Sequence, residues 1–138
     1  MNLKELVKDL REDEGVVPCP YVDSVGKATI GIGHNTDDNP LTDEMMEFIL
    51  LCDLRECVED LVNFPFWAIA NDARRNALLN LRFNLGPSRF RSFENAIHFA
   101  NMGMWDESAD EWKDSKWYGQ VGVRGPKVVE QVRNGEFR

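Results

Sequence analysis

The chain has 138 residues, and 16 Lys and Arg against 24 Asp and Glu give it a formal charge of −8. This length fits about one domain, and 43% apolar with 29% charged residues is an ordinary globular mixture, which excludes a disordered tail, a collagen-like chain and a coiled-coil rod. The acidic balance argues against a nucleic-acid partner and against attraction to an anionic membrane, because each would favour a basic surface.

The first predicted element is a helix over residues 2–12. Its apolar residues recur at the spacing of one helical face: Leu3, Leu6, Val7 and Leu10. Asn2 is placed to cap this helix, and Gly15 is placed to end it. The pattern then changes, since residues 21–33 alternate and turn in the manner of a small β-hairpin, and residues 34–40 have the composition of a loop.

The rest of the chain is predicted to be helical, in the segments 41–63, 72–85, 92–101, 105–113 and 126–133. The four tryptophans stand at helical spacing, which is more typical of a core than of a sugar-stacking surface. Segregated strands and helices indicate an α+β fold. We expect one domain, 1–138, with a small antiparallel sheet lobe packed beside a larger helical lobe and a ligand cleft between them. The small lobe would span about 13–40, and the helical lobe 1–12 and 41–138.

Glu14, Asp23 and Thr29 form the most informative constellation. Glu14 falls at a helix end, Asp23 precedes the hairpin turn, and Thr29 lies on the return strand. The negative end of the helix dipole, together with partial burial beside Gly15, would disfavour a charged Glu14, which suits a general acid. Asp23 near a turn should be better solvated and ionised. One protonated and one ionised carboxyl group are typical of the active sites of glycoside hydrolases. The alternative interpretation is that Glu14 and Asp23 are two solvated charges at the ends of a helix and a strand.

Signals for a metal or cofactor are weak. Cys19, Cys52 and Cys57 are an odd number without framework spacing, so we expect free thiols packed as small apolar groups in a reducing compartment. The two histidines are remote in sequence, which disfavours a zinc site, and the acidic run 37–39 lacks EF-hand spacing and is interpreted as a solvated loop. The glycines in 31–33 form only part of a dinucleotide motif. We expect neither metal nor cofactor.

The spacing around the constellation resembles a family signature. Eight residues separate Glu14 from Asp23, five separate Asp23 from Thr29, and the run Thr29–His34 reads TIGIGH. In this register the sequence is similar to the phage-type lysozyme (endolysin) family, glycoside hydrolase family 24, which includes the endolysins of T-even bacteriophages. The similarity continues through 72–86 and 105–124, and so covers nearly the whole chain.

The resemblance implies a role for each matched residue. Glu14 would protonate the glycosidic oxygen between N-acetylmuramic acid and N-acetylglucosamine. Asp23 would stabilise the oxocarbenium charge and, with Thr29, position a water on the opposite face, an inverting geometry with carboxyls roughly 6.5–9.5 Å apart. Arg124 resembles the arginine that pairs with the catalytic glutamate, and His34 would brace the lobe contact through an acid partner. The residues implied in glycan binding are Phe83, Asn84, Gln120 and Asn35.

Two other classes of protein act on peptidoglycan or bind it, and both are alternatives for this sequence. A lytic transglycosylase cleaves this bond by closing an anhydro ring, and it needs the acid but no Asp–Thr pair to position water. A non-catalytic peptidoglycan-binding module would keep the fold and lose the carboxylates. The register of Asp23 with Thr29 argues against the first, and the presence of both carboxyls argues against the second.

The cellular location and biological role that we expect follow from the family resemblance and from the composition of the N-terminal residues. Residues 1–13 are charged throughout and no apolar run approaches the ~20 residues of a membrane span, so we expect no signal peptide and no stable membrane association. We expect a monomer, made in the host cytoplasm and released to the periplasmic cell wall by a holin-type pore, that lyses a Gram-negative host for a phage or prophage. Peptidoglycan strands are its expected partner. A tail-borne lysozyme is the alternative setting.

Overall fold

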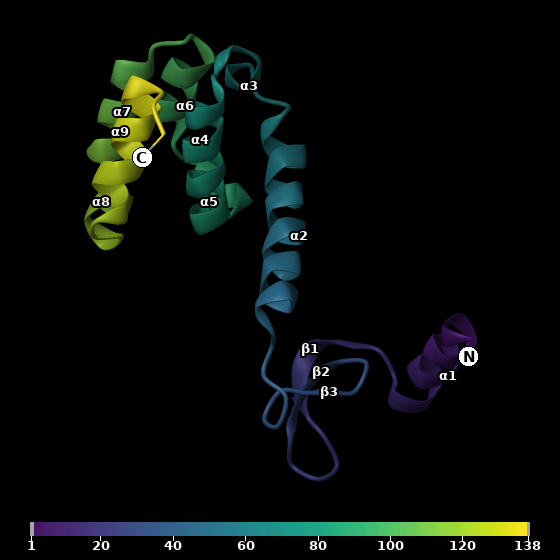
Figure 1. Cartoon of the computed structure of the whole chain (residues 1–138). Helices are drawn as coiled ribbons and strands as arrows, with labels where there is room; N and C mark the ends of the chain where they lie inside the picture. Colours follow the sequence, from purple (N-terminus) through teal and green to yellow (C-terminus); the bar gives the residue numbers. More distant parts are fainter. Residues whose placement is uncertain (1, 138) are drawn as a thin grey trace. The chain divides into compact units, whose positions relative to one another are not determined.

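The computed structural model describes residues 2–137, which divide into two compact units (Figure 1). One unit is Met1–Phe48 and the other is Ile49–Arg138. We call them the sheet unit and the helical unit. A small antiparallel sheet followed by many helices confirms the predicted α+β class, of lysozyme-like type. The assignment of residues 1–12 to the helical lobe stays a prediction.

The sheet unit begins with helix α1, Leu3–Glu14. The Asn2 side chain accepts a hydrogen bond from the Glu5 amide at 3.4 Å, and Gly15 ends the helix with a φ of 74°, so both predicted ends are confirmed. The helix runs two residues further than its apolar periodicity indicates. None of its residues is buried, so the apolar stripe of α1 is not covered by the sheet of its own unit.

The sheet has the strand order β1-β2-β3 and is antiparallel throughout (Figure 1). Its strands are β1 Val17–Val22, β2 Ala28–Gly31 and β3 His34–Asn35. Strand β1 begins earlier than predicted and contains Pro18 and Pro20, which lack the N–H of a ladder hydrogen bond. Its pairing with β2 is irregular between Val17 and Tyr21, and β1 is an edge strand, where proline is tolerated. Strand β3 lies in the segment predicted as a loop.

Thr29 is the buried residue of β2, with only 3% of its surface exposed. Alternation along a strand puts Thr29 on the face opposite Ile30 and Ile32. Of these isoleucines, Ile32 is 38% exposed. The protected face of this strand therefore carries a hydroxyl group, and that hydroxyl must find polar partners within the unit.

The helices follow in order: α2 Asp43–Leu61, α3 Phe66–Ile69, α4 Asp72–Leu85, α5 Pro87–Arg91, α6 Glu94–Asn101, α7 Trp105–Lys113, α8 Lys116–Gln120 and α9 Arg124–Asn134. The predicted bounds of α4 and α7 are confirmed. Those of α2 and α9 differ by one or two residues at each end, and α6 begins two residues later than predicted but ends where predicted. Helices α3, α5 and α8 were not predicted, because four or five residues are too few to show a helical period. No helix of residues 2–137 is long and apolar enough to cross a membrane.

The core lies in the helical unit, where α7 packs against α6 and α9. Trp112 and Trp117 are fully buried, and their rings meet edge to face at a centroid distance of 6.3 Å. Trp67 and Trp105 pack against the same core from its margin. The prediction that the tryptophans belong to the core is confirmed.

The three cysteines are free thiols. Cys57 is buried, and burial raises the pKa of its thiol, as expected of a cysteine packed like a small apolar group. Cys52 is half-buried and Cys19 is exposed on β1. The prediction of packed thiols is therefore wrong for Cys19, because neither face of β1 is covered there: Pro18, Cys19 and Pro20 are all exposed.

An ionic cluster joins three helices of the helical unit. Asp60 of α2 accepts hydrogen bonds from Arg82 of α4 and from Arg91 of α5. Arg82 is only 5% exposed. Burial opposes the charge of Asp60, but the hydrogen bonds from both arginines outweigh burial and hold its pKa below the ordinary value.

Replacing Asp60 by Asn is expected to lower the unfolding free energy by about 1.5–3 kcal/mol, because Arg82 loses its charged partner while buried. Since the folded-state pKa of Asp60 is lowered, its contribution is present above the unfolded pKa of about 3.9 and is lost as pH falls through the folded value. Urea unfolding at pH 7 and pH 3 should therefore show the difference from wild type shrinking in acid. Asp72→Asn, at an exposed pair with Arg75, is the control and should cost under about 1 kcal/mol. Equal effects of the two substitutions at pH 7 would contradict this account.

Candidate active site

All three predicted catalytic residues lie in the sheet unit. Glu14 is the last residue of α1, Asp23 follows directly after β1, and Thr29 is the second residue of β2. The antiparallel register pairs Tyr21 with Thr29, so the turn that begins at Asp23 brings its side chain back to the start of β2. The hairpin thereby explains why a spacing of six residues places these two groups together.

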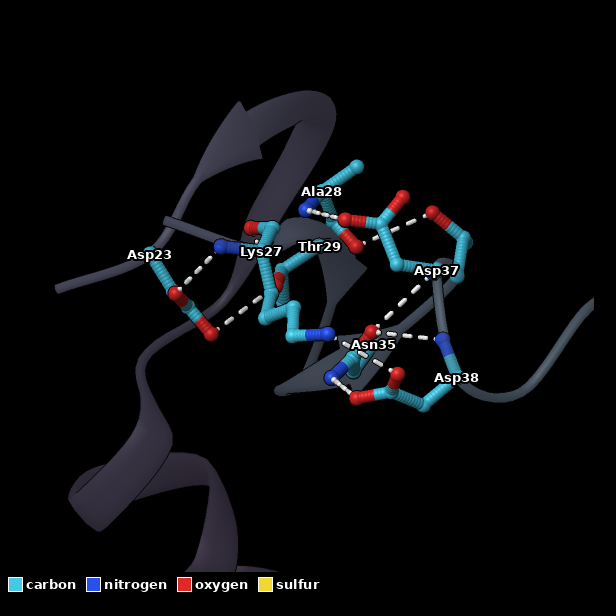
Figure 2. A network of polar contacts seen from close by, with 8 residues as sticks. Asp23, Lys27, Ala28, Thr29, Asn35, Asp37 and Asp38 are labelled. Atoms are coloured by element: carbon cyan, nitrogen blue, oxygen red, sulfur yellow. Dashed lines mark hydrogen bonds and ion pairs between the residues drawn. The ribbon is translucent and has the colours of Figure 1, made fainter. Parts of the chain in front are cut away.

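The Asp23 side chain is held by the turn that follows it (Figure 2). Its Oδ1 accepts hydrogen bonds from the backbone amides of Val25 at 3.0 Å and Lys27 at 2.8 Å. The backbone of Asp23 also bonds that of Lys27, because its amide donates to the Lys27 carbonyl at 2.9 Å. Asp23 therefore closes the turn at both backbone and side chain, which limits the positions that its carboxylate can take.

The same contacts set the charge of Asp23. The hydrogen bond from the Lys27 amide, with smaller contributions from the Val25 amide and the Thr29 hydroxyl, holds the pKa of Asp23 below its ordinary value of 3.8. Burial acts in the opposite direction and is outweighed. Asp23 is thus an ionised carboxylate at neutral pH, in agreement with the charge expected for it from its place near a turn.

Thr29 places its hydroxyl beside the second carboxylate oxygen of Asp23. Its Oγ1 lies 3.4 Å from Asp23 Oδ2 and 3.1 Å from the Lys27 carbonyl (Figure 2). A hydroxyl has one hydrogen to donate and two lone pairs to accept with, so these two oxygens compete for the one proton. The arrangement leaves acceptor capacity on both Thr29 and Asp23, and a water molecule could donate to it.

Glu14 is exposed, so the partial burial expected for it is wrong. Its side chain instead lies against the backbone of Gly33, between β2 and β3. A Cβ atom added to Gly33 would come within 2.8 Å of Glu14 Oε2 and 3.0 Å of its carboxyl carbon. Gly33 also has a φ of 65°, in the left-handed region that favours glycine. The second glycine of GIGH therefore leaves room for the Glu14 carboxyl.

Gly33→Ala is expected to reduce turnover by more than tenfold, because the new methyl group displaces the Glu14 carboxyl from its position. Gly31→Ala is the matched control, since Gly31 has a φ of 72° but no atom within 4 Å of an added Cβ. Both variants carry similar backbone strain, of order 1 kcal/mol, and should lose similar thermal stability. Turnover rates and melting temperatures of the two variants check the prediction. Equal turnover in both would contradict a role for this contact.

His34 and Asn35 form β3. The sequence predicts a supporting role for His34 and glycan binding for Asn35. The Nε2 atom of His34 is buried and has no hydrogen-bond partner among residues 2–137, and the acid partner expected for His34 at the lobe contact stays a prediction. The amide of Asn35 bonds within its own loop: its Oδ1 accepts from the amides of Asp37 and Asp38, and its Nδ2 donates to Asp38 Oδ2 at 2.9 Å. These contacts use the amide oxygen and one of the two N–H groups of Asn35, and glycan binding by Asn35 stays a prediction.

The other predicted residues belong to the helical unit. Phe83 of α4 is 41% exposed. Asn84 accepts a hydrogen bond from the Trp117 indole at 2.8 Å, and Gln120 accepts one from Arg89 at 3.1 Å. Arg124 donates from Nε to the Asn80 side chain at 2.8 Å and from Nη2 to the Asn80 carbonyl at 3.3 Å. The pairing of Arg124 with Glu14 stays a prediction.

Sequence reasoning missed the residues that hold the turn. The acidic run 37–39 is exposed and lies in a turn, in agreement with the predicted solvated loop, but the contacts of Asp37 and Asp38 were not predicted. Asp37 accepts from the Ala28 amide at 3.0 Å, and Asp38 pairs with the Lys27 ammonium at 2.9 Å (Figure 2). Among the described residues, no group of His, Cys, Asp or Glu side chains is placed to hold a metal ion.

The fold and these residues together define a chain of the lysozyme type. A family model described as phage lysozyme matches residues 11–134, which include Glu14, Asp23 and Thr29. The match covers most of the sequence, and the chain belongs to the phage lysozyme family. Membership places it among the lysozyme-type glycosidases.

Curated relatives come from a phage and from a eukaryote. The pre-baseplate central spike protein Gp5 of Enterobacteria phage T4 is 26% identical over 99% of this chain, and the match covers 28% of the spike protein. The chain thus spans less than a third of that relative. Probable T4-type lysozymes 1 and 2 of Dictyostelium discoideum are 24% and 26% identical, with 94% and 99% of this chain and 94% and 96% of their own lengths matched.

Proposed function

We propose that the protein is a muramidase, which hydrolyses the β-1,4 bond between N-acetylmuramic acid and N-acetylglucosamine in peptidoglycan. The observation that carries this proposal is the pair formed by ionised Asp23 and the Thr29 hydroxyl, 3.4 Å apart, in the same unit as Glu14. A carboxylate and a hydroxyl with acceptor capacity can orient a water molecule, which a hydrolase needs and a transglycosylase does not. Membership of the phage lysozyme family supports the same substrate class.

The proposed reaction is a single displacement with inversion. Glu14 donates its proton to the glycosidic oxygen as the bond to the anomeric carbon breaks. Asp23 stabilises the positive charge that develops on the sugar and, with Thr29, holds the attacking water on the opposite face. The water oxygen bonds to the anomeric carbon, and its proton passes to Asp23. The products are a new reducing N-acetylmuramic acid and a free hydroxyl on N-acetylglucosamine.

Glycan binding is proposed for Phe83, Asn84 and Gln120, with Arg124 pairing the Glu14 carboxyl. The half-exposed ring of Phe83 suits contact with the apolar face of a sugar. Asn84 and Gln120 each accept one internal hydrogen bond through the side-chain oxygen, which fixes the orientation of the amide group. Their amide nitrogens are the groups proposed to donate to the glycan.

The proposed setting is the lysis of a Gram-negative host by a phage or prophage, with a monomeric enzyme that reaches the periplasm through a holin-type pore. The match to a pre-baseplate spike protein of phage T4 supports the alternative that such a domain acts from a tail. Both settings require the same bond cleavage.

Chemical analysis of new reducing ends tests the proposed bond. Purified Gram-negative peptidoglycan is digested, reduced with borohydride and hydrolysed to amino sugars. The proposal predicts muramicitol in an amount that rises with time. Glucosaminitol would show cleavage of the other glycosidic bond, and soluble fragments without any alditol would show a transglycosylase. Retained binding with neither alditol nor soluble fragments would show a non-catalytic module.

A further inference from the structure

The loop after β3, residues 36–38, binds the two residues that precede Thr29, which are Lys27 and Ala28. Strand β3 has only two residues, so its ladder to β2 ends where Asn35 pairs with Thr29. Beyond this point no residue of β3 pairs with Ala28, whose strand partner is Val22 of β1. The Ala28 amide donates to Asp37 Oδ2 at 3.0 Å, and its carbonyl accepts from the Thr36 amide at 2.8 Å and hydroxyl at 2.9 Å. The Thr36 backbone and the side chains of Thr36 and Asp37 thus take the place of a longer β3 beside Ala28.

These contacts act on the peptide groups that hold the candidate catalytic pair. The carbonyl of Lys27 and the amide of Ala28 belong to one rigid planar peptide group. Its carbonyl accepts from the Asp23 amide and lies 3.1 Å from Thr29 Oγ1, while its amide donates to Asp37 (Figure 2). Asp37 therefore fixes the tilt of the same plane that orients Asp23 and Thr29. Thr36 fixes the next plane, between Ala28 and Thr29.

We propose that Thr36, Asp37 and Asp38, which we call the loop clamp, are positioning residues for catalysis by Asp23 and Thr29. The clamp itself is shaped by Asn35, whose Oδ1 accepts from the amides of Asp37 and Asp38. This inference rests on the proposed function and adds residues that act through the backbone rather than on the sugar.

The residues of the loop clamp are expected to differ in how strongly they affect catalysis. Asp38 holds Lys27 through an ion pair whose side chains are 56% and 40% exposed. Such exposed pairs contribute little, because solvent screens them and both side chains lose entropy. Asp37 accepts a hydrogen bond directly from the backbone amide of Ala28, in the peptide group whose carbonyl contacts Asp23 and Thr29. Asp37 is therefore expected to matter more than Asp38.

Asp37→Ala is expected to lower kcat on soluble peptidoglycan fragments about tenfold and to change KM less than about twofold. Asp37→Asn keeps an oxygen that can accept from Ala28, and its kcat should stay within about twofold of wild type. Asp43→Ala removes the same charge from the first turn of α2 and serves as the control. Amide hydrogen exchange by NMR should show Ala28 losing protection in Asp37→Ala and keeping it in Asp37→Asn.

The outcomes separate the clamp from the function on which it rests. Wild-type turnover with an unchanged kcat in folded Asp37→Ala would overturn the clamp alone. No turnover by the wild type would overturn the proposed function and the clamp together. If Asp37→Ala does not fold, Thr36→Val decides, since it removes only the hydroxyl bond to Ala28 and should lower kcat about threefold. A kcat equal to wild type in Thr36→Val would then overturn the clamp.

Discussion

Glu14→Gln is expected to reduce peptidoglycan cleavage by about 10²–10⁴-fold, because the amide cannot give a proton to the leaving oxygen. The variant should fold as well as the wild type. Glu14 is the last residue of α1, where the negative end of the helix dipole disfavours a carboxylate, so loss of the charge should leave the melting temperature equal or slightly higher. Turnover of soluble fragments and thermal unfolding measure the two effects.

Glu12→Gln is the matched control for this prediction. Glu12 lies in the last turn of the same helix, is exposed, and undergoes the same chemical change. Its activity should equal that of the wild type. If folded Glu14→Gln kept more than a few per cent of wild-type turnover, Glu14 could not be the general acid.

Asp23→Asn is expected to lower kcat by about 10²–10³-fold. The amide oxygen can still accept from the Lys27 and Val25 amides, so the turn should persist, but the negative charge that stabilises the oxocarbenium ion is lost. The asparagine also cannot take a proton from the attacking water. KM should change little, because the substitution removes an interaction that is strongest in the transition state.

The pH dependence of the wild type gives a second measurement of Asp23. The active form is ionised and its pKa lies below 3.8, so the loss of activity caused by Asp23 protonation should occur below pH 3.8 as the pH falls. Asp43→Asn is the charge-matched control and should keep the wild-type rate. An acid limb centred near pH 6 that disappears in Asp23→Asn would contradict the charge state assigned to Asp23.

Local sequence patterns predict those parts of the fold that local chemistry determines. The bounds of α4 and α7 follow from long apolar periods, and the ends of α1 follow from Asn2 and Gly15. Strand β1 was predicted too short, because Pro18 is typical of a break. The structure tolerates it in an edge strand, and whether a strand lies at an edge depends on the pairing of the whole sheet.

The candidate site likewise has a part that local sequence patterns predict and a part that they do not. The spacing of Glu14, Asp23 and Thr29 identifies the reacting groups, because the hairpin that joins Asp23 to Thr29 is local. The role of Asp37 was missed, since its contact joins residues nine apart across the edge of the sheet, and no spacing rule describes it. The partners of Asn35 were likewise not predictable from residue type, because an amide can bind a sugar or a backbone equally well.

Mass spectrometry of peptidoglycan digested in H₂¹⁸O tests the central claim, that Glu14, Asp23 and Thr29 deliver water to the glycosidic bond. The account predicts one ¹⁸O atom at each new reducing N-acetylmuramic acid, formed by the wild type and by Glu12→Gln and absent with Glu14→Gln. Fragments that end in 1,6-anhydro-N-acetylmuramic acid without ¹⁸O would show that the sugar's own hydroxyl closes the ring. That result would contradict the assigned roles of Asp23 and Thr29 and make the enzyme a transglycosylase.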